Sequence, residues 1–412
     1  MVEIDNRPMR VFDEQVIELL GGISAELMKS PVSRQYPDLM AFAFYIRKAN
    51  LIKLRDTLFP NTSPTAPITN HQASSTKHQA LSTLHSALRT RLGRGLCFHI
   101  APANIPVNFA FTWVFSLLAG NANIVRLPSK DFPQVTALLE IINRHLSQSG
   151  NLASRNRFMK YPRTDTETTA AYSAMADCRM IWGGDRTIAS VRALPTKPRC
   201  VDIAFADRYS VGLINGAAIE AADDVTLQRL AQDFYNDTYL MDQNACSSPQ
   251  LILWENDSEV ARQKFWNAVL LLAEKKYQMQ DAVAVDKYTA FCEEAATNIA
   301  VKSIERHGNL LTRVEFSTIE PQVVDLAKHR GKAGFFFEYA LKARQEFFAV
   351  VTEKFQTITQ FGIDVEHLRE EIVAAQLRGI DRIVPFGKAM DIGVIWDGHD
   401  LIYELSRVVF VF

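Results

Sequence analysis

The sequence lacks an excess of charge of either sign and a long apolar run. Its 45 Lys and Arg residues and 46 Asp and Glu residues leave a formal net charge of −1. This balance gives no long-range attraction to nucleic acid or acidic lipid. The most apolar segment, residues 107–119, is too short to cross a bilayer. We therefore expect no nucleic-acid role and no membrane span.

Cysteine is scarce and is not paired in the sequence. The five cysteines show no CxxC spacing, and none of the nine histidines has a ligand-spaced neighbour, so no metal site is predicted. An odd number of cysteines is typical of reduced thiols in the cytosol, and the charged N-terminus does not resemble a signal peptide. We expect a cytoplasmic protein. The cysteines are Cys97, Cys178, Cys200, Cys246 and Cys292.

The usual glycine-rich nucleotide motifs are also missing. Gly93 and Gly95 begin a GxG pattern, but its third glycine position holds Phe98, and there is no GxxxxGK[ST] loop. A nucleotide would have to bind without a glycine-rich phosphate-binding loop.

What is present is a long α/β pattern. With 412 residues the chain exceeds one compact core. Residues 11–58 have helical periodicity, residues 60–79 read as an exposed connector, and a helix is expected from about Ala80 to Arg91. Strand-like and helix-like segments then alternate over residues 90–220, which predicts an open parallel sheet.

Cys246 lies in the segment DQNACSSP, residues 242–249, directly before the apolar run 250–254. A cysteine kept for packing usually has apolar neighbours on both sides, whereas this one has an amide before it and two hydroxyls after it. The pattern is typical of a thiol in a polar loop at the edge of a strand, where it is a candidate nucleophile.

Asn104 is a second candidate. It follows a strand-like segment, and Pro102 and Pro106 stiffen the backbone on both sides. A carboxamide fixed in this way would donate to an oxyanion, although a helix N-cap or turn role is open for this residue. His99, within an apolar strand, is interpreted as a core histidine.

Several motifs together resemble the aldehyde dehydrogenase superfamily. PANIP, LLAGNANIVRLPSK, IWGGD and DQNACSSP occur in that superfamily's order, from about residue 90 to the C-terminus. DQNACSSPQLI and RGIDRIVPFGKAMDIGVIWDGHDLI are more closely similar to bacterial luminescence-type long-chain fatty acyl-CoA reductases (LuxC-like). The resemblance implies an aldehyde dehydrogenase-like α/β fold with an open parallel-sheet cofactor domain and a second α/β catalytic domain. The cofactor-binding domain would comprise residues 1–222, with their helical N-terminal part, and residues 380–412 would return to it. The catalytic domain, residues 223–379, would carry Cys246.

The resemblance also implies roles for individual residues. Cys246 matches the nucleophile that forms an acyl thioester, and Asn104 matches the oxyanion-hole asparagine. Gly183, Gly184 and Asp185 match the site where the cofactor pyrophosphate meets a helix start. The positions that hold the adenosine ribose are Arg126, Pro128, Ser129 and Lys130.

The ribose site departs from the common pattern. Many members have a lysine at the position of Leu127 and a glutamate at that of Lys130. A lysine and an arginine near the 2′ position favour a phosphate there, which predicts NADPH, although two solvated charges beside a proline turn are the open alternative. Glu346, in EFFAVV, resembles the glutamate that holds the nicotinamide ribose, and a surface helix glutamate is the alternative.

Phe205 is the most informative departure from the pattern of the aldehyde dehydrogenase superfamily. Aldehyde-oxidising members have a glutamate at this position that activates water to hydrolyse the thioester, and a phenylalanine cannot accept that proton. The resemblance therefore implies NADPH-dependent reduction of a long-chain fatty acyl-CoA to fatty aldehyde, with coenzyme A as leaving group. Phe109, Phe111 and Trp113 are placed to line an acyl pocket or to form plain core.

The resemblance further implies partners and leaves alternatives. The acyl group would come as fatty acyl-CoA or from an acyl-activating synthetase, and the chain is expected to form a homo-oligomer. The alternatives are NAD(P)-dependent aldehyde oxidation, a cofactor-free cysteine acyltransferase or thioesterase, and a non-catalytic scaffold subunit.

Overall fold

The computed structural model describes residues 3–60, 89–102 and 105–410. Contacts divide the chain into two compact units, residues 1–206 with 399–412 (unit 1) and residues 207–398 (unit 2). The boundaries predicted from the sequence, at residues 222 and 380, fall within unit 2. The connector at 60–79 lies outside the described residues.

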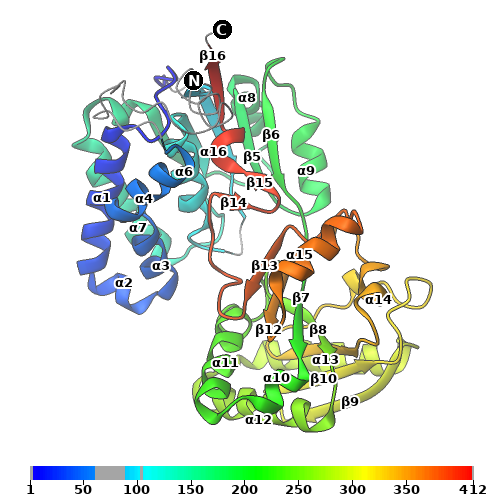
Figure 1. Ribbon diagram of the computed structural model, residues 1–412. Coiled ribbons are helices and arrows are strands. Elements are labelled where there is room, and N and C mark those ends of the chain that lie inside the picture. The colour runs from blue at the N-terminus through cyan, green and yellow to red at the C-terminus, as the bar shows by residue number, and fades with distance from the viewer. Residues whose placement is uncertain (1–2, 61–88, 103–104, 411–412) are drawn as a thin grey trace, which may run out of the picture. The chain divides into compact units, whose positions relative to one another are not determined.

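Unit 1 is built on a parallel sheet with helices on both faces (Figure 1). In its described part the strand order is β4-β3-β2-β5-β6, and all neighbours are parallel. Helix α6 packs on β2 and β3, whereas α8 packs on β2 and α9 on β5 from the other face. The strands and helices are β2 (Leu96–Ile100), β3 (Ala122–Arg126), β4 (Asn156–Met159), β5 (Cys178–Trp182), β6 (Val201–Phe205), α6 (Asn108–Leu118), α7 (Pro133–Ser147), α8 (Thr166–Met175) and α9 (Asp185–Arg192).

The N-terminal segment is helical, as its periodicity predicts. Asp13 caps α1 by accepting from the N–H of Gln15 at 3.0 Å, and the buried face of α1 packs against α3 and α7. The four helices are α1 (Glu14–Lys29), α2 (Pro31–Gln35), α3 (Pro37–Tyr45) and α4 (Lys48–Leu58).

The C-terminal segment belongs to unit 1 as well. Strand β1 (Arg89–Gly93) pairs antiparallel with β16 (Ser406–Phe410), after β15 (His399–Asp400) and α16 (Leu401–Glu404). The helix predicted up to Arg91 is therefore wrong at its described end, because Arg89–Arg91 pair with a strand that lies over 300 residues away.

Unit 2 contains a larger mixed sheet with the strand order β13-β12-β7-β8-β11-β10-β9 among its described residues. Neighbours are parallel except for β9 and β10. The sequence pattern grouped β7 with the first layer, but β7 pairs with β8 and β12 in this sheet. The strands of this sheet are β7 (Tyr209–Asn215), β8 (Pro249–Glu255), β9 (Val301–His307), β10 (Leu311–Phe316), β11 (Phe335–Ala340), β12 (Phe355–Phe361) and β13 (Arg382–Pro385). The short strand β14 (Ile395–Trp396) lies outside this sheet.

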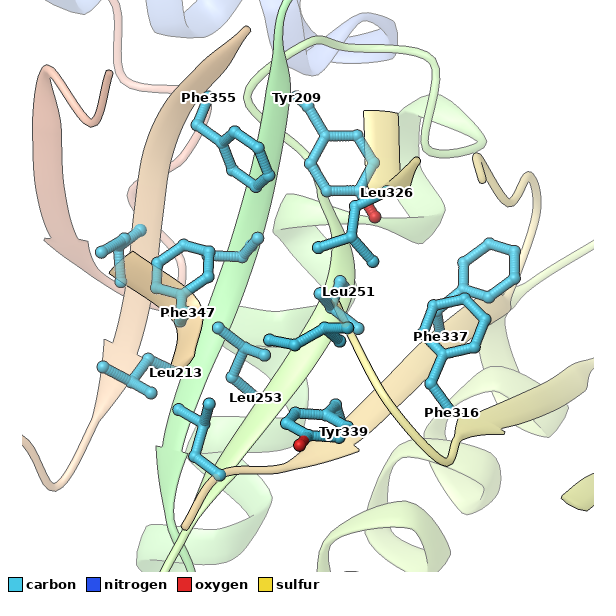
Figure 2. Packing of buried hydrophobic residues seen from close by; sticks show 14 of the residues in the cluster. Tyr209, Leu213, Leu251, Leu253, Phe316, Leu326, Phe337, Tyr339, Phe347 and Phe355 are labelled. Atoms are coloured by element: carbon cyan, nitrogen blue, oxygen red, sulfur yellow. The ribbon is translucent and has the colours of Figure 1, made fainter. Parts of the chain in front are cut away.

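Both faces of this sheet are buried, which explains the uninterrupted apolar run in β8. Leu251 and Leu253 belong to one cluster, shown in Figure 2, and the alternate residues Ile252 and Trp254 belong to the cluster on the other face. The helices of unit 2 are α10 (Gly216–Ala221), α11 (Asp224–Asp237), α12 (Glu259–Lys276), α13 (Asp281–Thr297), α14 (Arg344–Phe348) and α15 (Val365–Ala374). Short 3₁₀ turns occur at Tyr239–Met241 and Leu326–Lys328 in unit 2 and at Gly150–Arg155 in unit 1.

Candidate functional site

Cys246 lies in the turn between α11 and β8, as the sequence predicts for a thiol at a strand edge. The chain enters the turn through Asp242 and Gln243, which have positive φ of 50° and 56°. Gln243 is buried, and its Oε1 accepts from the N–H groups of Gly334 at 2.8 Å and Phe335 at 3.1 Å. Ser248 Oγ donates to the carbonyl of Asp237 at 2.7 Å. The polar neighbours of Cys246 in the sequence therefore fix the backbone of its loop.

The Cys246 side chain is half-buried, and polar groups of β7, β12 and the 397 region surround it. Ser210 Oγ donates to the Cys246 carbonyl at 2.7 Å. The pKa of the thiol is raised to about 11, chiefly by burial and also by the negative charge of Asp397, against the lowering effects of a hydrogen bond from Gln356 and the charge of Arg208. The thiol is protonated at neutral pH in the free protein.

Gly183, Gly184 and Asp185 lie where β5 passes into α9, at the carboxyl edge of the unit 1 sheet. The connections from β2 and β5 leave toward opposite sides of the sheet, so this edge is the topological switch point, where open α/β sheets bind ligands. A Cβ at Gly183 would lie 3.0 Å from Thr187, whereas one at Gly184 would meet nothing within 4 Å. Gly184, at the N-cap of α9, offers no side-chain acceptor. This helix start fits a phosphate group.

Arg126 ends β3 at the same edge of the sheet, and its guanidinium lies 4.9 Å from the Tyr161 ring centroid. Pro128 is buried, while Ser129 and Lys130 are exposed. Arg163 was not predicted from the sequence: its Nη2 donates to Thr187 Oγ1, in the first turn of α9, at 2.6 Å. The structure thus brings Arg126 and the 183–185 turn to one edge and adds a second arginine.

Asn104 lies outside the described residues. Glu346 is in unit 2, and its Oε2 accepts from the Lys342 N–H at 3.0 Å and the Tyr339 hydroxyl at 3.4 Å. In the register of β11 and β8, Tyr339 lies opposite Leu253. Leu253 is four residues from Pro249, the first residue of β8, and at the rise of a strand these two residues are about 13 Å apart. In Figure 2, Tyr339 lies at the opposite end of the cluster from Tyr209. The structure therefore does not bring Glu346 close to Cys246, and its ribose role stays a prediction.

Phe205 is the last residue of β6 and is 2% exposed. Its ring stacks on Trp182 with centroids 3.8 Å apart. Phe205 is the sequence position at which the resemblance predicts the water-activating glutamate of other members. Phe109, Phe111 and Trp113 are buried in α6, where Trp113 Nε1 donates to Asn156 Oδ1 at 2.7 Å. These contacts agree with a core role.

Comparison with solved structures identifies the class. The 1-pyrroline-5-carboxylate dehydrogenase of Thermus thermophilus superposes with a TM-score of 0.64 and 13% identity, covering 97% of this chain and 81% of that chain. Aldehyde dehydrogenase 21 of Physcomitrella patens gives 0.62 and 12%, covering 96% and 85%, and its structure holds the product succinate. Glyceraldehyde-3-phosphate dehydrogenase of Methanocaldococcus jannaschii, complexed with NADP, gives 0.63 and 11%, covering 97% and 89%. The chain has the aldehyde dehydrogenase fold, as the sequence resemblance predicts.

The sequence family can be assigned more specifically than the fold. The family model described as acyl-CoA reductase (LuxC) matches residues 81–317, more than half of the chain. The chain therefore belongs to the acyl-CoA reductase (LuxC) family, and the sequence resemblance is confirmed. No curated protein matches the sequence at a significant level. Family and fold together support an oxidoreductase whose chemistry involves aldehydes. None of the described helices has the length and apolar character needed to span a membrane.

Proposed function

We propose that this chain reduces a long-chain fatty acyl-CoA to the fatty aldehyde through an acyl thioester on Cys246, with NADPH as the reductant. The observation that carries the proposal is the half-buried thiol of Cys246, held in a fixed turn before β8, in a chain of the acyl-CoA reductase family.

In the first step the Cys246 sulfur bonds to the acyl carbonyl carbon, and the bond from that carbon to the sulfur of coenzyme A breaks. The backbone N–H of Cys246 and the carboxamide of Asn104 donate to the oxyanion, and losing one such donor typically lowers the rate about 100- to 1000-fold. With a pKa of about 11, only about one Cys246 in ten thousand is ionised at pH 7. Groups that favour the thiolate therefore control this step.

The residues of unit 1 fit a dinucleotide without a glycine-rich loop. Gly183, Gly184 and Asp185 would hold the pyrophosphate, and Arg126, Pro128, Ser129 and Lys130 the adenosine ribose. The half-buried guanidinium of Arg126 and the nearby Arg163 favour a further phosphate on that ribose, which supports NADPH. When bound, the cofactor supplies a hydride.

Phe205 supports reduction over hydrolysis. Its buried ring, stacked on Trp182, cannot take a proton from water. An acyl group on Cys246 then persists until it is reduced or transferred to another thiol. The aldehyde dehydrogenases of similar fold make aldehyde oxidation the second candidate, and the Phe205 pair argues against it.

The proposal includes a cytoplasmic location, a homo-oligomer and an acyl donor that is either fatty acyl-CoA or a synthetase. These points follow from the family resemblance and the sequence.

Mass spectrometry of the intact protein after exposure to acyl-CoAs of graded length tests the proposal. We expect one acyl adduct, mapped to Cys246, that is lost in Cys246→Ala and kept in Cys292→Ser, since Cys292 is exposed and serves as the matched control. Adding NADPH should remove the adduct and release aldehyde. An adduct on another side chain, or acid formed from aldehyde and NADP without coenzyme A, would contradict the proposal.

A further inference from the structure

Two opposite charges lie beside the Cys246 sulfur. Arg208 Nη1 is 2.7 Å from Asp397 Oδ1, and Arg208 Nη2 is 2.5 Å from Asp381 Oδ2. The side chains of Arg208 and Asp397 are 11% and 3% exposed, so water screens them weakly and their charges act strongly on their neighbours. Asp397 disfavours a thiolate at Cys246, and Arg208 favours it.

Gln356 connects this pair to the sulfur. It is buried on β12, its Nε2 donates to Asp397 Oδ1 at 2.9 Å, and its side chain also hydrogen-bonds Cys246. A carboxamide N–H remains a donor at every pH, so it stabilises the thiolate more than the thiol. Accepting one N–H, Asp397 fixes the orientation of the amide toward the sulfur.

The other cysteines have different surroundings. Cys97 and Cys178 are fully buried, and Cys178 hydrogen-bonds Cys97, while Cys292 is exposed. Cys200 is half-buried near the Arg179–Asp202 ion pair, but no amide donor is among the groups that shift its pKa. The amide donor of Gln356 therefore distinguishes Cys246 from Cys200.

We infer that Gln356, Arg208 and Asp397 are positioning residues for Cys246. Gln356 donates to the thiolate, and Arg208 offsets the charge that Asp397 places beside the sulfur. The consequence for acyl transfer rests on the proposed function, whereas the consequence for the thiol itself does not. The charged groups that face the sulfur are Asp397 and Arg208, with Asp381 behind Arg208.

Alkylation of the full-length protein with iodoacetamide tests this inference. The rate is measured at Cys246 by peptide mass spectrometry from pH 7 to 10, without acyl-CoA or cofactor. This range lies below the thiol pKa of about 11, so the rate is proportional to the thiolate fraction, and the ratio of variant to wild-type rates gives the shift in apparent pKa. Arg208→Met should raise this apparent pKa by at least one unit, which is about tenfold slower alkylation at a given pH below it. Gln356→Leu should raise it as well. Asp397→Asn keeps the acceptor for Gln356 but not the charge, so it should lower the apparent pKa.

The double variant Arg208→Met/Asp397→Asn should return toward the wild-type profile, because both charges are then removed. Arg208→Lys keeps the charge and should stay near wild type, and Arg208→Gln replaces Arg208→Met if that variant does not fold. A purely structural role predicts instead that alkylation speeds up equally at every pH. Cys97 and Cys178 must stay unalkylated in each variant, as a check that their surroundings remain folded.

The inference fails if Arg208→Met and Gln356→Leu keep the wild-type apparent pKa, or if Asp397→Asn shifts it in the same direction as Arg208→Met. Because alkylation needs no substrate, either result is independent of whether the protein reduces acyl-CoA. Loss of acyl transfer with normal alkylation profiles would count against the proposed function alone.

Discussion

Cys246 depends on residues that lie far from it in the sequence. Its own loop could be predicted, because an amide and two hydroxyls beside a thiol form a local pattern. Arg208, Gln356 and Asp397 could not, since each is ordinary in its own segment. Arg208 and Gln356 meet Cys246 because β7 pairs with both β8 and β12, and Asp397 joins them by accepting a hydrogen bond from Gln356. Pairing between distant segments leaves no local signal in the sequence.

His99 shows the opposite case, where a local pattern was sufficient. The sequence predicts a hydrogen-bonded core histidine, and the side chain is fully buried with Nε2 3.0 Å from Asn123 Oδ1. Burial lowers its pKa from 6.5 to about 4. Between these two pH values the unfolded chain binds more protons than the folded chain. The contribution of His99 to the free energy of unfolding is therefore fully present above pH 6.5 and is lost as the pH falls from 6.5 through 4.

We expect His99 to contribute a loss of about 3 kcal/mol in unfolding free energy between pH 6.5 and 4. His99→Gln keeps a donor for Asn123 and cannot become charged, so its stability should lack this component. Urea unfolding at a series of pH values, followed by circular dichroism, measures the difference. Parallel curves for the two proteins would show that His99 does not titrate in this way.

At the scale of elements, strongly periodic or uninterrupted apolar segments could be predicted, and polar segments could not. The strand-like and helix-like segments that the sequence indicated within residues 90–220 correspond to β2, β3, β5, β6 and β7 and to helices α6, α7 and α9, and the apolar run 250–254 corresponds to β8. Strand β4 and helix α8 were missed. Helix α8 is rich in threonine and has little apolar periodicity, and the structure stabilises its start by Asp165, which accepts from the Thr168 N–H at 2.9 Å. Strand β1 depends on a partner at the other end of the chain.

Glu338 links three elements around β11, and its removal should be costly. Its carboxylate is buried and accepts from Trp254 Nε1 at 2.8 Å, Trp266 Nε1 at 2.7 Å and Arg313 Nε at 2.7 Å. Glu338→Ala would leave these donors buried without an acceptor, and we expect a loss of about 3–5 kcal/mol in unfolding free energy.

The matched control is Glu305→Ala. Glu305 pairs with the same Arg313 at 2.8 Å, but its side chain is 53% exposed, so the loss should stay below about 1 kcal/mol. Urea unfolding followed by tryptophan fluorescence compares the two variants. Equal losses would mean that burial of Glu338 does not decide its contribution.

At the scale of the whole molecule, the two units differ in how the chain builds them. Unit 2 is one continuous segment, residues 207–398, with a buried cluster on each face of its sheet. Unit 1 needs both ends of the chain, because residues 399–412 return to it. The sequence indicated this return through the family resemblance, whereas the point at which the chain changes units, near residue 206, has no composition shift that marks it.

The returning segment is integrated into unit 1 by polar and apolar contacts. Asn121 Nδ2 donates to the Leu405 carbonyl at 2.9 Å, while Asn121 Oδ1 accepts from the Arg94 N–H at 2.7 Å. Leu401, Ile402 and Leu405 are fully buried. Burial of three such side chains contributes about 5–9 kcal/mol, which is comparable to the whole stability of a domain.

A chain that ends at Gly398 should therefore lose the fold of unit 1 and keep that of unit 2. Hydrogen exchange should show that amides of β2, β3 and β5 lose protection, while those of β7, β8 and β11 remain protected, and a fragment of residues 207–398 should unfold cooperatively. The control is Val408→Ser/Val409→Ser in the full chain, because these side chains are 42% and 40% exposed and contribute little to the core. Retained protection of β2, β3 and β5 in the shortened chain would show that the C-terminal return is dispensable, because the remaining contacts of unit 1 would then suffice to hold its sheet.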